Sequence, residues 1–205
     1  MPVNRPVIGN ASRTTSGMKT VRRIAIVGGS GSGKTTLGRQ LAKLVGGVFV
    51  EIDAIQHKPH WNKASVEEIR MGIHAALQGQ SRWVIDGTCE REVGDFIASR
   101  ADLLVWLDLP LIVKLVRLLR RSWRRVQTRE VLWNGNVETW GDVFVGRDSV
   151  LAHPLRTHFR QRRQMLARPN HANIVRLRST REVGEWLSRM QRQRDAPKET
   201  PSLAP

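Results

Sequence analysis

The residues with the clearest chemical meaning form one segment near the start of the chain. It reads Gly28-Gly29-Ser30-Gly31-Ser32-Gly33-Lys34-Thr35, is followed by Thr36, and satisfies the pattern G-x-x-x-x-G-K-[ST]. Glycines allow successive backbone N–H groups to point at phosphate oxygens, and the start of a following helix adds partial positive charge. We expect residues 28–36 to bind a nucleoside triphosphate. Lys34 would reach the β- and γ-phosphates as a catalytic residue, and the Thr35 hydroxyl would bind Mg²⁺.

Two carboxylates come directly after apolar runs that are typical of buried strands. Asp86 follows the run 83–85, and Asp53 follows the run 48–52. Because open α/β sheets bind ligands at the carboxyl ends of their strands, both are candidate site residues. We assign Asp86 a catalytic and metal-binding role, since it could hold Mg²⁺ through water or accept a proton from an acceptor hydroxyl. The alternative for Asp86 is a cap at the end of the strand.

The loop after Asp53 is the candidate acceptor side. It contains His57, His60 and Trp61, which could hold an acceptor by hydrogen bonds and stacking. Ordinary packing under a loop is the alternative for Trp61. A His-x-x-His metal site at His57 and His60 is a further alternative, although no partner ligands stand out in the sequence.

A long basic helix is expected from Leu111 to Arg129, with Asp108 as its cap. Several of its arginines, including Arg117 and Arg121, share one side at helical spacing. One or two of them could stabilise charge on a transferring phosphoryl group, where an arginine can contribute about 10³–10⁵ in rate. The alternative is a solvated basic face. Arg120 is rotated by about 100° from Arg121 and serves as a comparison.

The order of the elements predicts an α/β fold. Apolar runs that are expected to form strands alternate with helical patterns, which favours a parallel sheet covered on both faces. Serines followed by Glu three residues later, Ser65 with Glu68 and Ser179 with Glu182, are typical of helix starts. Helical pieces are expected over 137–167, broken near Pro154. The expected strands are 24–27, 48–52, 83–85, 103–107 and 174–177.

The length fits one domain over residues 21–190. Residues 1–20 and 191–205 lack hydrophobic periodicity and are expected to be disordered tails, and Met18 could be the true start. No apolar stretch reaches the roughly 18–20 residues of a membrane span. The single cysteine, Cys89, has no disulfide partner in the chain and suits a cytoplasmic location.

The charge balance leaves two interpretations open. The chain has 34 Lys and Arg against 18 Asp and Glu, a formal net charge of +16. Such a protein could hold nucleic acid through its phosphates, or it could use the cations around a nucleotide. No nucleic-acid motif accompanies the charge, so we favour the nucleotide and expect only weak, nonspecific binding to nucleic acid. The absence of N-K-x-D, which would read guanine, favours ATP over GTP.

Over residues 22–190 the chain resembles the adenylate-kinase-like P-loop kinases, and is most similar to the bacterial topology modulation proteins. The segments that carry the resemblance are IAIVGGSGSGKTTLGRQLA, EIDAIQHKPHW, RWVIDGTCER, LLVWLDLP, WNGNVETW and VRLRSTREVGEWL. Two departures are present. The Asp-Gly pair is followed by Thr88-Cys89-Glu90 before Arg91 where adenylate kinases have Phe-Pro-Arg, and their monophosphate-binding sequence is missing.

The resemblance implies roles for further residues. Arg117 and Arg121 match the spacing of family arginines that contact the donor nucleotide and its phosphates, so Arg117 is assigned to ATP binding and Arg121 to catalysis. Asp86 with Gly87 matches a pair that lies near Mg²⁺ in adenylate kinases. The turn 177–180 resembles the loop beneath the donor adenine.

Together these observations predict a P-loop NTPase three-layer sandwich with a mostly parallel five-stranded sheet and an α-helical lid over about 120–165. The expected activity is transfer of the γ-phosphate of Mg-ATP to an unidentified small-molecule or nucleotide acceptor. The acceptor is expected to lie near Asp53, Trp61 and Arg91. The alternatives are a nucleic-acid-associated NTPase and an ATP-binding regulatory module.

Overall fold

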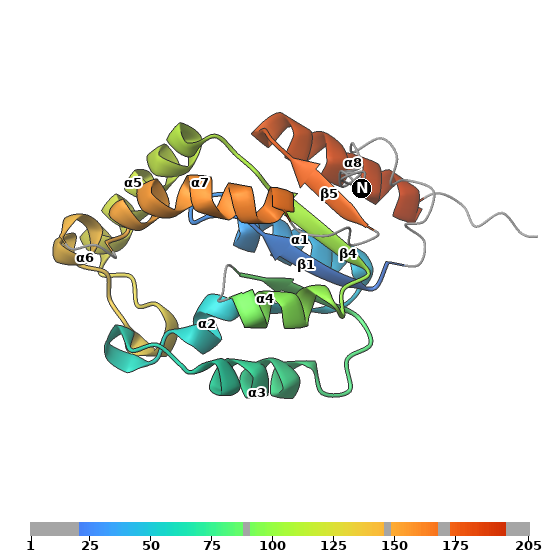
Figure 1. Ribbon diagram of the computed structural model, residues 1–205, viewed down its shortest axis with the longest axis horizontal. Helices are drawn as coiled ribbons and strands as arrows, with labels where there is room; N and C mark the ends of the chain where they lie inside the picture. The colour runs from blue at the N-terminus through green and yellow to red at the C-terminus, as the bar shows by residue number, and fades with distance from the viewer. Residues whose placement is uncertain (1–20, 88–90, 146–148, 168–172, 196–205) are drawn as a thin grey trace, which may run out of the picture.

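Five strands form a single sheet in the order β2-β3-β1-β4-β5, and every neighbouring pair is parallel (Figure 1). The computed structural model describes residues 21–87, 91–145, 149–167 and 173–195. The strands are β1 (Arg23–Val27), β2 (Val48–Glu51), β3 (Trp83–Asp86), β4 (Leu103–Leu107) and β5 (Ile174–Leu177). β1, which leads into the glycine-rich loop, lies at the centre of the sheet, so the loop emerges from its most buried part.

Helices connect the strands and cover both faces of the sheet. The α-helices are α1 (Lys34–Val45), α2 (Ile52–Gln56), α3 (Val66–Leu77), α4 (Arg91–Ala98), α5 (Leu111–Thr128), α6 (Trp140–Phe144), α7 (Ala152–Ala167) and α8 (Thr180–Asp195). Two short 3-10 turns are η2 (Pro59–Trp61) and η3 (Trp133–Gly135). Figure 1 shows α3 and α4 together on one side of the sheet and α5 and α6 beyond one end of it. α7 runs from the region of α6 back to the sheet, where Met165 packs against its core residues. Within the described residues, no helix has both the length and the apolar composition needed to cross a membrane.

The alternation of side chains along the strands produces two apolar layers. On β1, Ile24 and Ile26 pack with residues of α1 and α8, whereas Ala25 between them packs with residues of α3 and α4. Successive strand side chains point to opposite faces, so one short apolar strand serves both layers. This is the three-layer arrangement that the sequence predicted.

Local signals place the ends of several helices. α1 begins after Gly33, at φ 92°, and ends at Gly46, at φ 65°, whose N–H donates to the Ala42 carbonyl. The Ser65–Glu68 capping box is confirmed, since each side chain accepts from the backbone N–H of the other residue.

Three predicted boundaries are wrong. The second strand ends at Glu51, and Ile52 already begins α2, so Asp53 lies in the first turn of a short helix. Pro154 does not break a helix, because it lies in the first turn of α7, where a missing N–H costs no hydrogen bond. α8 continues past Met190 to Asp195.

The expected cap at Asp108 is also wrong. Pro110 precedes α5, and the Asp108 carboxylate instead accepts hydrogen bonds from Nε, at 2.9 Å, and Nη2 of Arg176. Arg162 Nε of α7 lies 3.3 Å from the same carboxylate. The neighbouring strand β5 brings Arg176 to this position, which spacing along the sequence could not show.

Candidate functional site

The glycine-rich loop lies between β1 and α1 and supports the close approach of α5. Gly31 has φ 77°, and a Cβ built there would lie 2.5 Å from the Lys114 carbonyl oxygen. A Cβ on Gly29 would lie 2.9 Å from Lys114 Nζ. A side chain at Gly31 would therefore push the α5 backbone away from the loop, whereas one at Gly29 would displace the Lys114 ammonium group. The loop has the curled backbone and helix N-terminus that suit phosphate oxygens.

A cleft of about 770 Å³ extends from this loop. It joins loop residues 30–36, including Lys34, to Asp53 of α2 and to Arg117 and Arg121 of α5. Thr180 of the predicted adenine turn lines it too. Residues that the sequence analysis did not assign also line it: Leu37, Arg39, Gln40, Glu51, Leu109, Arg124, Arg125, Glu130, Val131, Leu132, Trp133 and Val183. Much of the predicted site is thus brought together in one space.

Four predicted residues do not line the cleft, and a fifth cannot be placed in it. Gly28 and Gly29 precede the part of the loop, residues 30–36, that lines the cleft. Asp86 lies deeper, with a relative exposure of 2%. Trp61 packs edge-on against His57, with ring centroids 5.4 Å apart, and Trp133 lines the cleft in its place. Arg91 begins α4, but its side chain lies outside the described residues, as does Cys89.

Arg117 ties three elements together at one end of the cleft. Its Nη1 donates to the Ser32 carbonyl at 3.3 Å, and its Nη2 donates to the Thr180 hydroxyl at 2.8 Å. Thr180 starts α8 and lines the cleft with Val183. This geometry joins Arg117 to the turn 177–180, and its contact with a donor nucleotide stays a prediction.

The carboxylates beside the loop come from two neighbouring strands. Glu51 and Asp86 are partners in the parallel register of β2 and β3. The Thr35 hydroxyl donates to Glu51 Oε1 at 3.1 Å, and Asp86 Oδ2 is buried with no hydrogen-bond partner among the described residues. Burial raises the pKa of Asp86 to about 6, against the opposing influence of the Lys34 charge and the Thr35 hydroxyl. Glu51 was missed because nothing in the sequence separates a strand-end glutamate from a surface one.

These oxygens fit a magnesium ion in chemical type. Mg²⁺ prefers one or two carboxylates and hydroxyl or phosphate oxygens over a cage of protein ligands. The Thr35 hydroxyl with Glu51, Asp53 or Asp86 supplies such a set, and Asp86 Oδ2 accepts no hydrogen bond from the described residues. The described residues contain no group of three or more His, Cys, Asp or Glu side chains suited to a metal. His57 and His60 therefore have no third ligand among them.

Asp86 should make stability depend on pH in a defined direction. Its folded-state pKa of about 6 lies above its usual value of 3.8, so the folded protein binds more protons and loses stability as pH rises through this window. Asp86→Asn should therefore unfold less readily than the wild type at pH 7, by up to about 3 kcal/mol. Urea denaturation at pH 7 and pH 4 measures this, and the two proteins should converge at pH 4. A variant less stable than the wild type at pH 7 would contradict the burial argument.

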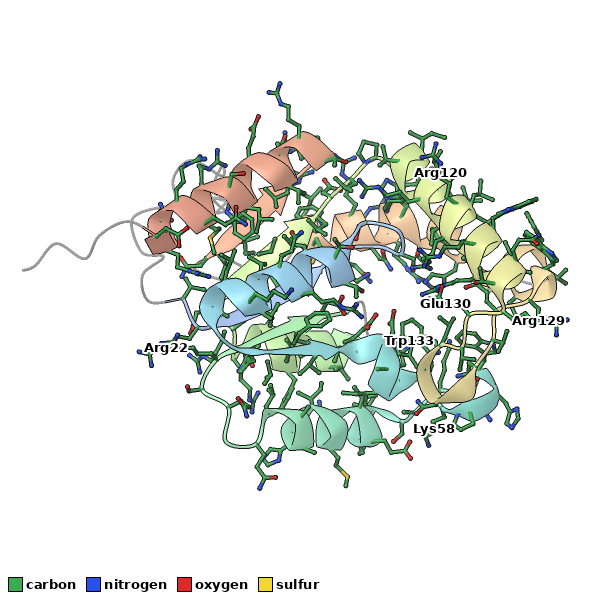
Figure 2. All side chains as sticks on the ribbon, turned by 180° about the vertical axis from the view of Figure 1, so that it is seen from behind. Arg22, Lys58, Arg120, Arg129, Glu130 and Trp133 are labelled. Atoms are coloured by element: carbon green, nitrogen blue, oxygen red, sulfur yellow. The ribbon has the colours of Figure 1, made fainter. Side chains whose placement is uncertain are left out.

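The other end of the cleft is rich in arginine. Burial and the neighbouring Arg125 charge lower the pKa of Arg121, and Arg121 Nε has no hydrogen-bond partner among the described residues. Arg125 Nη1 lies 3.3 Å from Glu138 Oε2, and its guanidinium lies 5.8 Å from the centre of the Trp133 ring. Figure 2 shows Glu130 and Trp133 on the inner side of this region, whereas Arg120 and Arg129 point away from it. Arg120 is exposed, whereas Arg121 is partly buried and lines the cleft, as their different directions on the helix lead us to expect.

A second lysine, Lys114 of α5, packs against the glycine-rich loop. Lys114 is buried, and its Nζ lies 2.8 Å from His158 Nδ1 of α7. Burial lowers the pKa of Lys114 and that of His158, which the Lys114 charge lowers further. Although α5 is a basic helix, the fold turns Lys114 inward against the phosphate loop.

Comparisons with known proteins agree with this architecture. No family model matches the sequence, and no curated protein matches it significantly. The structure of shikimate kinase from Acinetobacter baumannii in complex with shikimate aligns with TM-score 0.53 and 18% identity, over 87% of this chain and 96% of that chain. Shikimate kinase from Bacteroides thetaiotaomicron aligns with TM-score 0.54 and 16% identity, over 86% of this chain and 100% of that chain. At these identities the likeness shows the fold, and the predicted α/β class with a five-stranded sheet, here all parallel, is confirmed.

Proposed function

We propose that this protein is an ATP- and Mg²⁺-dependent phosphotransferase that acts on a small-molecule or nucleotide acceptor. The observation that carries the proposal is the continuity of the cleft, which runs from the phosphate loop to the arginines and Asp53. A donor and an acceptor can therefore lie in one space. The shared fold with shikimate kinases supports the proposal.

In this mechanism the loop 28–36 holds the triphosphate and Arg117 lies toward the donor base. The acceptor hydroxyl oxygen forms a bond to the γ-phosphorus while the bond from that phosphorus to the β-phosphate oxygen breaks, and ADP leaves. Asp53, which lines the cleft, would accept the hydroxyl proton, with Asp86 deeper beside Thr35. Bound Mg²⁺ would neutralise charge on the phosphates. Arg121 would stabilise the charge that is redistributed as the phosphoryl group moves.

The acceptor end favours an acceptor with a negative charge. Arg121, Arg124 and Arg125 line it beside the Trp133 indole, and Asp53 supplies a hydrogen-bond acceptor for a hydroxyl. Arginine binds carboxylate and phosphate groups through two parallel hydrogen bonds. Membership in the topology modulation group and a cytoplasmic location stay predictions from the sequence.

An acceptor screen tests the proposal. Purified protein with ATP and Mg²⁺ should form ADP above the acceptor-free background when hydroxylated carboxylates, sugar phosphates or nucleoside monophosphates are supplied. The phosphorylated product should appear in equal amount to the ADP. If no small acceptor raises ADP formation and a nucleic acid does, the protein is a nucleic-acid-associated NTPase instead.

A further inference from the structure

Two hairpins far apart in the sequence have the same geometry. The first hairpin spans residues 57–63, and the second hairpin spans residues 131–137. Each is closed by an isolated antiparallel bridge between its ends, His57 with Lys63 and Val131 with Val137. Each also has one 2.7 Å backbone hydrogen bond at its second residue, from Lys58 to the Asn62 carbonyl and from Leu132 to the Asn136 carbonyl.

The likeness extends to the tip and to the helix that follows. The fourth residue of each hairpin is left-handed, with φ 59° and ψ 33° at His60 and φ 56° and ψ 33° at Asn134. A capping box then starts the next helix in both cases, at Ser65 for α3 and at Thr139 for α6. The same local structure is thus built twice from different sequences.

Two asparagine side chains of the second hairpin join it to the first hairpin and to α2 by four hydrogen bonds, which we call the clasp. Asn136 Nδ2 donates to the Lys58 carbonyl at 2.9 Å, and its Oδ1 accepts from the Trp61 N–H at 3.0 Å. Asn134 Nδ2 donates to the carbonyls of His57, at 2.5 Å, and Ala54, at 3.2 Å. Figure 2 shows Lys58 and Trp133 in the same corner of the molecule.

The clasp sets the position of the cleft wall. The His57 and Trp133 rings stack at 5.7 Å with an interplanar angle of 17°, and Trp133, Leu132 and Val131 line the cleft. The first hairpin, residues 57–63, follows α2, which carries Asp53. Asn136 is 4% exposed, so its bonds across the clasp are shielded from water.

We propose that Asn134 and Asn136 are positioning residues that hold the Trp133 wall over the acceptor end of the cleft. By tying the second hairpin to the first, they make Trp133 and Asp53 parts of one rigid unit. This role rests on the proposed phosphotransfer, because the wall would both place the acceptor and keep water from the triphosphate. Excluding water matters since hydrolysis competes with transfer.

Asn134→Gly is a test with a matched control. Glycine accepts the left-handed backbone at φ 56°, so the variant loses the two side-chain bonds without backbone strain. His60→Gly makes the same change at the equivalent tip. The sequence placed His60 on the acceptor side, but its side chain is exposed and does not line the cleft, so it serves as the control. Because both variants add a glycine to the unfolded chain, that entropic effect is shared.

Three readouts separate positioning from general damage. Asn134→Gly should speed amide hydrogen exchange at Lys58 and Leu132 by at least about 10-fold. It should raise acceptor-free ADP formation several-fold, because water reaches the triphosphate, and lower acceptor-dependent transfer by about 10-fold. His60→Gly should leave all three within about 2-fold of the wild type. A structural role alone would lower both ADP-forming reactions together.

A different result would contradict each of the three claims: the clasp, the positioning role and the proposed function. Equal exchange rates in the two variants would overturn the clasp. Faster exchange in Asn134→Gly with unchanged or jointly reduced ADP formation would overturn the positioning role. A wild type that hydrolyses ATP but phosphorylates no acceptor would contradict the proposed function. The exchange and acceptor-free readouts would then still decide whether the clasp holds the water-excluding wall.

Discussion

Lys34→Ala should lower ADP formation by at least about 10²-fold, because it removes the loop cation that we expect to contact the phosphates. Lys34 is the first residue of α1 and lines the cleft, so alanine there leaves a good helix former in place. The loss should appear in turnover at saturating ATP and in ATP affinity measured by calorimetry with Mg²⁺. The far-ultraviolet circular dichroism should not change.

Lys43→Ala is the control for this substitution. Lys43 lies on the exposed side of the last turn of the same helix, away from the cleft lining. It should leave turnover within about 2-fold of the wild type. A wild type that binds neither ATP nor GTP would remove the basis for every other functional prediction, whatever the variants do.

Arg121→Ala should lower turnover by about 10³-fold while ATP affinity changes only a few-fold. Its contact with the phosphoryl group would tighten mainly in the transition state, which separates an effect on turnover from one on binding. Its buried Nε lacks a hydrogen-bond partner among the described residues, so the side chain is not committed to a structural bond at that atom. Steady-state kinetics with an identified acceptor, or acceptor-free ATP hydrolysis, would measure the effect.

Two neighbours on α5 complete this test. Arg120 is exposed and points away from the cleft, so Arg120→Ala should be nearly silent (Figure 2). Arg117→Ala should weaken ATP binding as much as turnover, because Arg117 joins the loop to Thr180 beside the cleft. Equal, mild losses in all three variants would mean that the arginines act only as a diffuse positive surface.

Local signals explain why much of the fold could be predicted. A phosphate loop needs its glycines, lysine and threonine at fixed spacing between a strand and a helix, so the pattern carries its own structural context. The capping box at Ser65 is equally local, since the bonds join residues three apart. Short apolar runs alternating with helical patterns were enough to indicate the parallel sheet. The amino-acid sequence by itself therefore determined the fold class, the loop and the helix that presents Arg117 and Arg121.

Only the tertiary structure decided which distant residues share the cleft. Glu51 accepts a hydrogen bond from Thr35 because β2 lies beside β3, which in turn lies beside β1 and its loop. Asp108 accepts hydrogen bonds from Arg176 because β5 lies beside β4. Trp133 lines the cleft in place of Trp61 because one hairpin is clasped over the other by Asn134 and Asn136. These contacts join residues 16 to about 80 positions apart. They depend on strand order and packing, which leave no periodic mark along the chain.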